Sequence, residues 1–168
     1  YLLIYIENKS PFFYQERIGK NKSIFVLIKF RTMAIGTNSC ATHLVDSSRI
    51  TRLGNILRKT KIDELPQLLN VIKGDMSLIG PRPERPEIEK EKLKKIPYYS
   101  SRYIIKPGIS GWAQVNYPYG ASVKDTAKKL SYDIYYISHF SILLDLLILF
   151  KTIKIVINAK NFYPKNIK

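Results

Sequence analysis

The stretch Lys59-Thr-Lys-Ile-Asp-Glu-Leu-Pro-Gln-Leu-Leu-Asn-Val-Ile-Lys-Gly-Asp-Met-Ser-Leu-Ile-Gly-Pro-Arg-Pro-Glu-Arg-Pro86 determines how the rest of the chain is organised. Its first half places two adjacent carboxylates, Asp63 and Glu64, where a helix is expected to begin. Unpaired N–H groups and the positive end of the helix dipole stabilise an ionised carboxylate there, and they also attract phosphate. An ionised Asp can act as a nucleophile that forms a covalent phosphoryl intermediate. The pair therefore predicts chemistry on a phosphorylated substrate.

The second half of the stretch ends in a loop from Gly80 to Pro86 that prolines make rigid. It carries two guanidinium groups, Arg82 and Arg85, on either side of Pro83. Guanidinium groups held at fixed positions are suited to bidentate binding of a diphosphate. We therefore expect this loop to contribute an anion site next to the carboxylate pair.

The predicted helix between them has one polar face and one apolar face. Asp63, Gln67 and Asn70 share the polar face. The opposite face consists of Leu65, Leu68, Leu69 and Ile72. A structural interpretation remains open, in which Thr60 and Asp63 form a capping box, or Asp63 alone caps the helix with Pro66 in the first turn. Capping accounts for Asp63 but not for the shared polar face.

Composition limits the possible partners. A chain of 168 residues fits one domain with a substantial core, and its net charge of +15 indicates a polyanionic partner such as a phosphorylated substrate, an acidic membrane or a nucleic acid. The single cysteine, Cys40, excludes an internal disulfide, and with two separated histidines a zinc site is not expected. No apolar run reaches the ~20 residues that a membrane span needs.

On the N-terminal side, residues 11–14 and 23–30 are rich in aromatic and β-branched residues, with Gly19-Lys-Asn-Lys22 between them. This pattern predicts a β-hairpin. Its second strand leads into Lys29-Phe-Arg-Thr-Met33, where Lys29 and Arg31 are either phosphate contacts or solvated charges at a strand end. Residues 34–45, which include His43, lack a hydrophobic period and predict a surface loop.

Two charged helices are expected around the central stretch. The first begins at Ser47 or Ser48 and runs to about Lys59, and it is either packed in the fold or placed in the headgroup layer of an acidic membrane. The second covers residues 84–95, whose alternating Glu and Lys predict a solvated surface. Further on, Gly108 and Gly111 either bring the backbone close to a ligand or form a structural turn supported by a buried Trp112.

Two further helices close the chain. Ser122 and Asp125 form a capping-box start, followed by an apolar stripe of Val123, Ala127, Leu130, Ile134 and Ile137. A flank of Tyr132, Tyr135 and Tyr136 belongs either to the core or to a bilayer interface. The last helix, about residues 141–158, is apolar nearly all round apart from Asp145. Together these elements predict a mainly helical α+β domain with one small β-hairpin and with amphipathic helices lying at a membrane surface.

Three motifs resemble the bacterial sugar transferases, which are the monotopic polyprenyl-phosphate phosphoglycosyl transferases of glycoconjugate and exopolysaccharide assembly. The motifs are Thr60-Lys-Ile-Asp-Glu-Leu-Pro-Gln67, Gly74-Asp-Met-Ser-Leu-Ile-Gly-Pro-Arg-Pro-Glu84 and Lys106-Pro-Gly-Ile-Ser-Gly-Trp-Ala-Gln-Val115. The resemblance runs in order from about Gln15 to the end, and residues 116–125 are similar to the exopolysaccharide-type subset. The chain departs from the family in lacking an acidic residue soon after Met33 and in having Ser110 where Thr is usual.

The resemblance implies a reaction and its participants. A UDP-sugar would bind with its diphosphate near Arg82 and Arg85, a Mg²⁺ ion would be held by the diphosphate and Glu64, and Asp63 would take the sugar phosphate before passing it to polyprenyl phosphate. The substrate-binding residues that it implies are Lys29, Arg31, Gln67, Arg82, Pro83, Arg85, Lys106 and Gly108. The catalytic residues that it implies are Asp63 and Glu64.

The resemblance also implies a setting. Residues 1–168 would form a single catalytic domain from a longer protein, seated on the lipid surface at the cytoplasmic face of the bacterial inner membrane through a segment missing from this chain. Nucleic acid is not an expected partner, although the charge and the twelve tyrosines also suit a nucleic-acid-binding module that pairs basic grooves with stacking aromatics. A membrane-surface module without catalysis is the remaining alternative.

Overall fold

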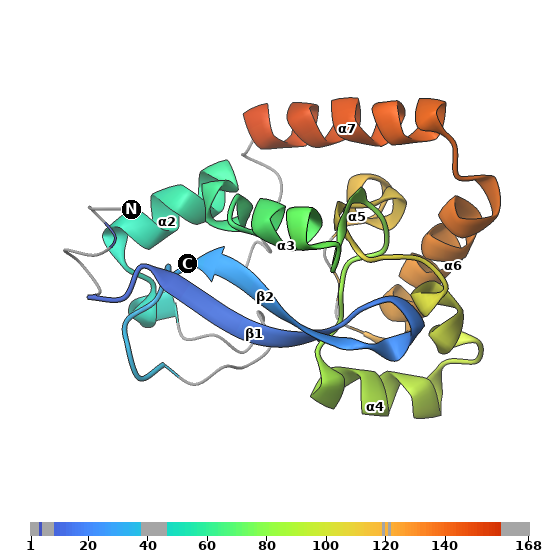
Figure 1. The fold of residues 1–168 in the computed structure, drawn as a ribbon, viewed down its shortest axis with the longest axis horizontal. Coiled ribbons are helices and arrows are strands. Elements are labelled where there is room, and N and C mark those ends of the chain that lie inside the picture. Colours follow the sequence, from blue (N-terminus) through green and yellow to red (C-terminus); the bar gives the residue numbers. More distant parts are fainter. Residues whose placement is uncertain (1–3, 5–8, 38–46, 119, 121, 159–168) are drawn as a thin grey trace.

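A twisted antiparallel hairpin crosses the middle of the molecule in the computed structural model, which describes residues 4, 9–37, 47–118, 120 and 122–158 (Figure 1). Strand β1 (Phe12–Ile18) pairs with β2 (Ile24–Phe30), from Phe12 opposite Phe30 to Ile18 opposite Ile24. The 3₁₀ turn Lys20–Lys22 joins them. The hairpin confirms the prediction, with a first strand that continues to Ile18; the loop predicted to contain Cys40 and His43 lies mostly outside the described residues.

A second, smaller sheet was not predicted from the sequence. Strand β3 (Ser77–Ile79) lies parallel to β4 (Gly108–Ser110), with Ser77 opposite Gly108 and Ile79 opposite Ser110. Each strand has only three residues, so neither has the alternating run by which a strand is recognised in sequence. The pairing places the central motif and the Lys106–Val115 motif side by side.

Helices make up most of the remaining structure, as expected for a mainly helical α+β fold. The α-helices are α2 (Arg52–Thr60), α3 (Gln67–Lys73), α4 (Pro86–Lys95), α5 (Trp112–Asn116), α6 (Val123–His139) and α7 (Ile142–Ile157). Shorter 3₁₀ turns are Ser47–Arg49, Ile62–Glu64 and Tyr99–Tyr103. Figure 1 places α7 along one edge of the molecule and α4 along the opposite edge, with α3 and α5 between them.

The core consists of three small clusters rather than one. Ile18, Ile96, Tyr99, Tyr103 and Leu130 pack near α4 and α6. Phe25, Leu27 and Met76 pack beneath the hairpin, and Ile79, Tyr136 and Ile148 pack beneath α7. Tyr136 also donates a 2.6 Å hydrogen bond to Asp145, which explains the single carboxylate in the apolar helix α7. That helix begins close to the predicted position, with the Ser141 side chain as its N-cap, accepting from the Leu144 N–H.

Two helix starts differ from the prediction. Helix α2 begins later than expected, because Thr51 rather than Ser47 or Ser48 is its N-cap and accepts from the Gly54 N–H. Glu84 lies before α4, is half-buried and contacts Lys92, Tyr99 and Arg102, so the acidic residue at the start of the predicted solvated helix is paired with neighbouring side chains.

Helix α6 also turns a different face inward than its apolar stripe predicted. The Ser122–Asp125 capping box is confirmed. Of the predicted stripe, Leu130 is buried, whereas Val123 and Ile134 are exposed. The buried face is Thr126, Leu130, Asp133 and Tyr136. Asp133 pairs with the buried Arg102 at 2.8 Å, and this ion pair fixes the rotation of the helix.

Large apolar side chains remain exposed on α3 and α7. The expected apolar face of the central stretch, which comprises Leu65, Leu68, Leu69 and Ile72, is confirmed and points to solvent. On α7 only Ile148 is buried; Ile142, Leu143, Leu146, Leu147, Leu149, Phe150, Ile153 and Ile157 are exposed. Within the described part of the chain, no helix combines the length and apolar character needed to cross a membrane.

Candidate active site

Glu64 is the point at which the hairpin and the proline loop meet the central stretch. Its Oε1 accepts from Lys29 Nζ on β2 at 3.0 Å and from Arg82 Nη2 at 2.9 Å. The Glu64 side chain is only 13% exposed. Burial acts to raise the pKa of Glu64, but Arg82 and Lys29 outweigh it and hold that pKa well below the usual range. Glu64 is therefore an ionised carboxylate that binds both cations, and the three side chains Glu64, Lys29 and Arg82 are called the Glu64 clamp below.

Asp63 lies beside this clamp in a different environment. Its side chain is buried, and its Oδ1 has no hydrogen-bond partner. Burial, with a smaller contribution from Glu64, raises the pKa of Asp63. Asp63 does not lie at the start of a helix, contrary to the prediction, and the capping alternative is wrong as well. Asp63 belongs to the 3₁₀ turn, and α3 begins only at Gln67 without a side-chain cap.

The local backbone explains this arrangement. Lys61 adopts a left-handed conformation that ends α2, and Ile62–Glu64 then form the tight turn. Thr60 donates its hydroxyl back to the Ile56 carbonyl, so it does not form a capping box with Asp63. The turn thus presents Asp63 and Glu64 toward β2 instead of toward the end of a helix.

The polar face of α3 is confirmed, and it attaches the helix to the hairpin. Asn70 is 1% exposed, donates to the Val26 carbonyl at 2.8 Å and accepts from the Ile28 N–H at 3.1 Å. Gln67 is 2% exposed and its Nε2 has no partner. Asn70 therefore has a structural role, because it satisfies two backbone groups of β2.

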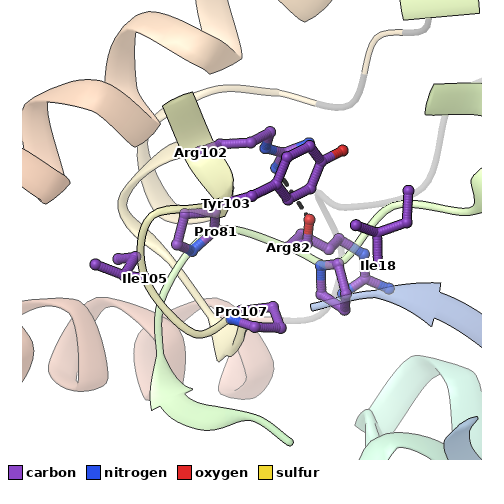
Figure 2. A pocket seen from close by; sticks show the side chains of 8 residues that line it. Ile18, Pro81, Arg82, Arg102, Tyr103, Ile105 and Pro107 are labelled. Atoms are coloured by element: carbon purple, nitrogen blue, oxygen red, sulfur yellow. Dashed lines mark hydrogen bonds between the residues drawn. The ribbon is translucent and has the colours of Figure 1, made fainter. Parts of the chain in front are cut away.

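The proline loop is held from behind by a buried cation. Figure 2 shows Arg102 reaching the backbone carbonyl of Arg82, to which it donates at 2.9 Å. Arg102 also pairs with Asp133, and it donates to the Tyr99 hydroxyl at 2.6 Å. On the other side of the loop, Arg17 Nη1 donates to the Pro83 carbonyl at 2.9 Å. These bonds fix the loop that carries Arg82 toward Glu64.

Glycines allow the loop to pack against the Lys106–Val115 motif. A Cβ on Gly108 would overlap the backbone nitrogen of Gly80, and a Cβ on Gly111 would overlap the Gly80 carbonyl oxygen. Gly108 N–H in turn donates to the Pro81 carbonyl at 2.9 Å. The close approach at both glycines is thus between two backbone segments. Trp112 is half-buried rather than buried, and it stacks on Tyr135.

The structure brings together some of the residues expected to bind substrate and separates others. Lys29, Gln67, Arg82 and Pro83 line one small cavity beside Glu64. Arg31 instead donates to the carbonyls of Ser10 and Phe12, and Arg85 Nε lies 3.4 Å from Glu87 Oε2. Lys106 is exposed near Gly74.

Sequence reasoning gave no role to Arg17, Glu84, Arg102 or Asp133 at the site. Glu84 was interpreted as part of a charged, solvated helix, which is the usual position for such a residue. Asp133 interrupts the apolar run 130–137, and a carboxylate inside such a run was the available signal for a buried ion pair.

The donor atoms fit magnesium held largely by substrate phosphate. Among the described residues, no group of three His, Cys, Asp or Glu side chains could hold a metal ion by itself. Magnesium commonly uses one or two carboxylates together with phosphates and water. Asp63 Oδ1 is a buried oxygen without a partner, and both ion pairs of Glu64 involve Oε1 alone. These two carboxylates therefore suit such an ion.

Comparison with known proteins assigns the family. The model of the bacterial sugar transferase family matches residues 1–159. The chain is 46% identical over 161 residues to the UDP-N-acetylgalactosamine-undecaprenyl-phosphate N-acetylgalactosaminephosphotransferase of Aeromonas hydrophila, covering 94% of this chain and 38% of that protein. It is 41% identical over 162 residues to the uncharacterized sugar transferase EpsL of Bacillus subtilis, covering 94% of this chain and 75% of that protein.

A third relative carries a different sugar in its name. The UDP-glucose:undecaprenyl-phosphate glucose-1-phosphate transferase of Xanthomonas campestris is 38% identical over 166 residues, and the match covers 94% of this chain and 34% of that protein. The chain thus spans little more than a third of the Aeromonas and Xanthomonas proteins. Since the family model covers nearly all of the residues, and the Glu64 clamp lies within the shared region, this chain belongs to the bacterial sugar transferase family.

Proposed function

We propose that this protein transfers a sugar-1-phosphate from a UDP-sugar to undecaprenyl phosphate or a similar polyprenyl phosphate, as the initiating step of exopolysaccharide or glycoconjugate synthesis. The observation that carries the proposal is the buried, unpartnered Oδ1 of Asp63 beside the Glu64 clamp. The names of the relatives support the class of donor and acceptor. Those names differ in the sugar, so the proposal covers UDP-sugars as a class.

The chemistry consists of two displacements at one carboxylate. Ionised Asp63 attacks the sugar-bearing phosphorus; a bond forms from its oxygen to phosphorus while the bond to the bridging oxygen breaks, and UMP leaves with that oxygen. An oxygen of polyprenyl phosphate then attacks the same phosphorus and releases the Asp63 carboxylate. The product is a polyprenyl diphosphate sugar. One diphosphate bond is broken and one is made, so catalysis depends chiefly on positioning and charge neutralisation.

The environment of Asp63 suits a nucleophile. A desolvated carboxylate with a raised pKa lacks the hydrogen bonds that would stabilise its charge and reduce its reactivity. Lys29 and Arg82 are held by Glu64 at positions where they can bind phosphate oxygens. Mg²⁺, when bound by the diphosphate and Glu64, would neutralise part of the phosphate charge.

The exposed apolar side chains of α3 and α7 support a position at a lipid surface. Contiguous exposed apolar surface marks sites of interaction with proteins or membranes. The acceptor is a lipid, and α3 begins at Gln67, three residues after Glu64. We therefore propose that these helices lie in the interface of the cytoplasmic leaflet, with the net charge of +15 favouring acidic lipids.

The test measures UMP release from a panel of UDP-sugars by the full-length protein in detergent, with Mg²⁺ and polyprenyl phosphate present. We expect release with at least one sugar, abolished by Asp63→Asn and by chelation. Wild-type protein incubated with a sugar-labelled donor alone should retain label covalently, and Asp63→Asn should not. Release that persists in Asp63→Asn would contradict the covalent step. No release from any donor would favour a membrane-surface or nucleic-acid-binding module without catalysis.

A further inference from the structure

A small cavity opens between the hairpin, the start of α3 and the proline loop. It is lined by Arg17, Leu27, Lys29, Gln67, Arg82 and Pro83. Three cationic side chains and one amide therefore line this opening.

Arg17 has no carboxylate partner among the residues that the structure describes. Its guanidinium donates to two neutral oxygens, the Pro83 carbonyl at 2.9 Å and the Gln15 amide oxygen at 2.5 Å. Its Nε is enclosed and bonds to nothing within the described residues. Burial, and then the positive charge of Arg82, lower the pKa of Arg17 to about 10. A partly buried cation that lacks a counterion is costly unless an anion enters beside it.

Gln67 provides an independent second observation. Its side chain lines the same cavity and is 2% exposed, and its Nε2 has no hydrogen-bond partner. Buried amide donors are normally paired, and one that is not costs free energy. Asn70, one turn later on α3, satisfies both ends of its amide on the backbone of β2. Gln67 therefore lines the cavity with a buried amide nitrogen that no described residue binds.

The lining of the cavity is cationic, because three of its six residues are basic and none is acidic. Lys29 and Arg82 share one carboxylate oxygen of Glu64, and Arg17 adds a third positive charge. An anionic group with oxygen acceptors would satisfy Arg17 Nε and Gln67 Nε2 together and would offset the excess charge.

We propose that this cavity is a subsite for the oxygens of a substrate phosphoryl group, with the Nε–H of Arg17 and the Nε2–H of Gln67 as its donors. The inference rests on the proposed function in so far as the phosphoryl group belongs to the donor diphosphate or to the lipid phosphate. Arg17 thereby becomes a substrate-binding residue in addition to those that the motifs indicated.

The test is isothermal titration calorimetry with inorganic pyrophosphate on the full-length protein in detergent. The variants are Arg17→Gln and Gln67→Met; the second removes only an unpartnered polar group and keeps the size of a buried side chain. Lys95→Gln is the matched control for loss of one positive charge, because Lys95 lies on α4, is 54% exposed and pairs only with Glu91 in the described structure. Thermal unfolding of each unliganded variant confirms that it is folded.

We expect both cavity variants to weaken pyrophosphate binding by about 10- to 100-fold, which is the effect of losing a charged or buried hydrogen bond, and the control to change it less than twofold. Wild-type affinity in both variants would overturn the subsite. A loss in Arg17→Gln with wild-type affinity in Gln67→Met would also overturn it, since Arg17 would then act only through the Pro83 loop.

Two further titrants identify the source of the phosphoryl group. Weaker binding of UDP alone in the cavity variants assigns the subsite to the donor, and weaker binding of a short-chain polyprenyl phosphate alone assigns it to the acceptor. Loss of both indicates a site shared by the two displacements. Parallel assays of UMP release separate the two proposals. If the cavity variants weaken pyrophosphate binding but the wild-type protein releases no UMP, the subsite stands and the proposed function fails. If the wild-type protein releases UMP and the cavity variants bind pyrophosphate as tightly as wild type, the proposed function stands and the subsite fails.

Discussion

The carboxylates of Asp63 and Glu64 are adjacent in the chain, yet their environments move their pKa values in opposite directions. Burial raises the pKa of Asp63. Burial acts in the same way on Glu64, but Arg82 and Lys29 overcome it and lower that pKa well below the usual range. Paired carboxylates with separated pKa values are typical of sites in which the two groups have different roles. Here they suit a nucleophile and a charged clamp.

Glu64→Gln should change the pH dependence of the transfer reaction as well as its rate. The negative charge of Glu64 is the second cause of the raised pKa of Asp63, so its removal lowers that pKa. The acidic limb of kcat, along which Asp63 ionises as pH rises, should therefore move to lower pH. The plateau should fall at least about tenfold, because Lys29 and Arg82 lose their shared partner.

Initial rates of UMP release from about pH 4 to 8 would measure this shift. The control is Glu91→Gln, which removes a carboxylate that is 73% exposed on α4. It should leave both the limb and the plateau unchanged. An acidic limb that stays in place or moves to higher pH in Glu64→Gln would contradict the proposed coupling between the two carboxylates.

Asp63→Asn should stabilise the fold in a pH-dependent way. Because the folded-state pKa of Asp63 lies above its ordinary value of 3.8, ionisation costs folding free energy. That cost is absent below pH 3.8 and is fully present above the raised pKa. The free energy of unfolding of Asp63→Asn minus that of wild type should therefore increase with pH. Urea unfolding at several pH values measures this difference, and a difference that shrinks with rising pH would refute it.

Replacing one partner of the ion pair between Arg102 and Asp133 should lower the free energy of unfolding substantially. Both side chains are buried and lie 2.8 Å apart. Asp133→Asn leaves a buried guanidinium without its counterion, a change that typically costs about 3–5 kcal/mol. A milder variant, Arg102→Lys, keeps the charge but cannot make all three bonds, to Asp133, Tyr99 and the Arg82 carbonyl.

Denaturant unfolding of the two single variants and the double variant gives the coupling energy of the pair. A coupling energy near zero would mean that the pair does not act as a unit. In Arg102→Lys we expect KM for the UDP-sugar to rise more than kcat falls, since the loop that presents Arg82 would be less well fixed. Unchanged kinetics would show that Arg102 supports the fold without positioning the loop.

Gly108→Ala should destabilise the protein and disturb the proline loop. The added Cβ would meet the backbone of Gly80, which cannot move aside as a side chain can. We expect a loss of ~1–3 kcal/mol, typical of overpacking. Gly19→Ala is the comparison, because its Cβ would meet the movable hydroxyl of Ser23 at 3.1 Å and a ring carbon of Phe25 at 3.2 Å. Equal losses in thermal unfolding would argue against a special role for the contact between β3 and β4.

Removing apolar side chains from the exposed face of α7 should weaken attachment to acidic liposomes. Leu143 and Phe150 are 79% and 69% exposed. Burial of such a side chain in the interface contributes ~1.5–3 kcal/mol, so Leu143→Ser and Phe150→Ser should each reduce partitioning about tenfold or more. Tyr98→Ser, at an 80% exposed position next to α4, should not. Flotation with liposomes measures the partitioning; equal effects at Tyr98 and Phe150 would contradict a specific membrane face.

Local signals in the sequence predicted the elements whose causes are local. The hairpin and the capping box of Ser122 and Asp125 follow from turn residues and short-range hydrogen bonds. The polar face of α3 follows from helical periodicity. The start of the helix was predicted at Asp63, whereas the left-handed Lys61 inserts a separate turn before α3, and nothing in the composition of the stretch signals that conformation.

The wrong prediction for helix α6 and the missed sheet of β3 and β4 have a common physical origin. The stripe on α6 was counted from apolar residues alone, whereas the helix is rotated by the pairing of Asp133 with Arg102 from another segment. The parallel strands β3 and β4 are too short to show a pattern and exist through their pairing. In each case the determining contact joins residues far apart in the chain, and the hydrophobic periodicity of one segment gives no information about its contacts with another segment.

The parallel pairing of β3 with β4 has a consequence for how the protein is made. A ribosome releases the Arg82 loop well before Gly108, Asp133 and Ile148, which fix it and cover its strands. Long-range pairing of this kind forms late, after the cost of closing the loop between the strands has been met. The nascent chain therefore completes the packing around the Arg82 loop only when α7 emerges with its exposed apolar face. Under the proposed function, the substrate-binding loop and the face proposed to contact lipid would be completed at the same stage of synthesis.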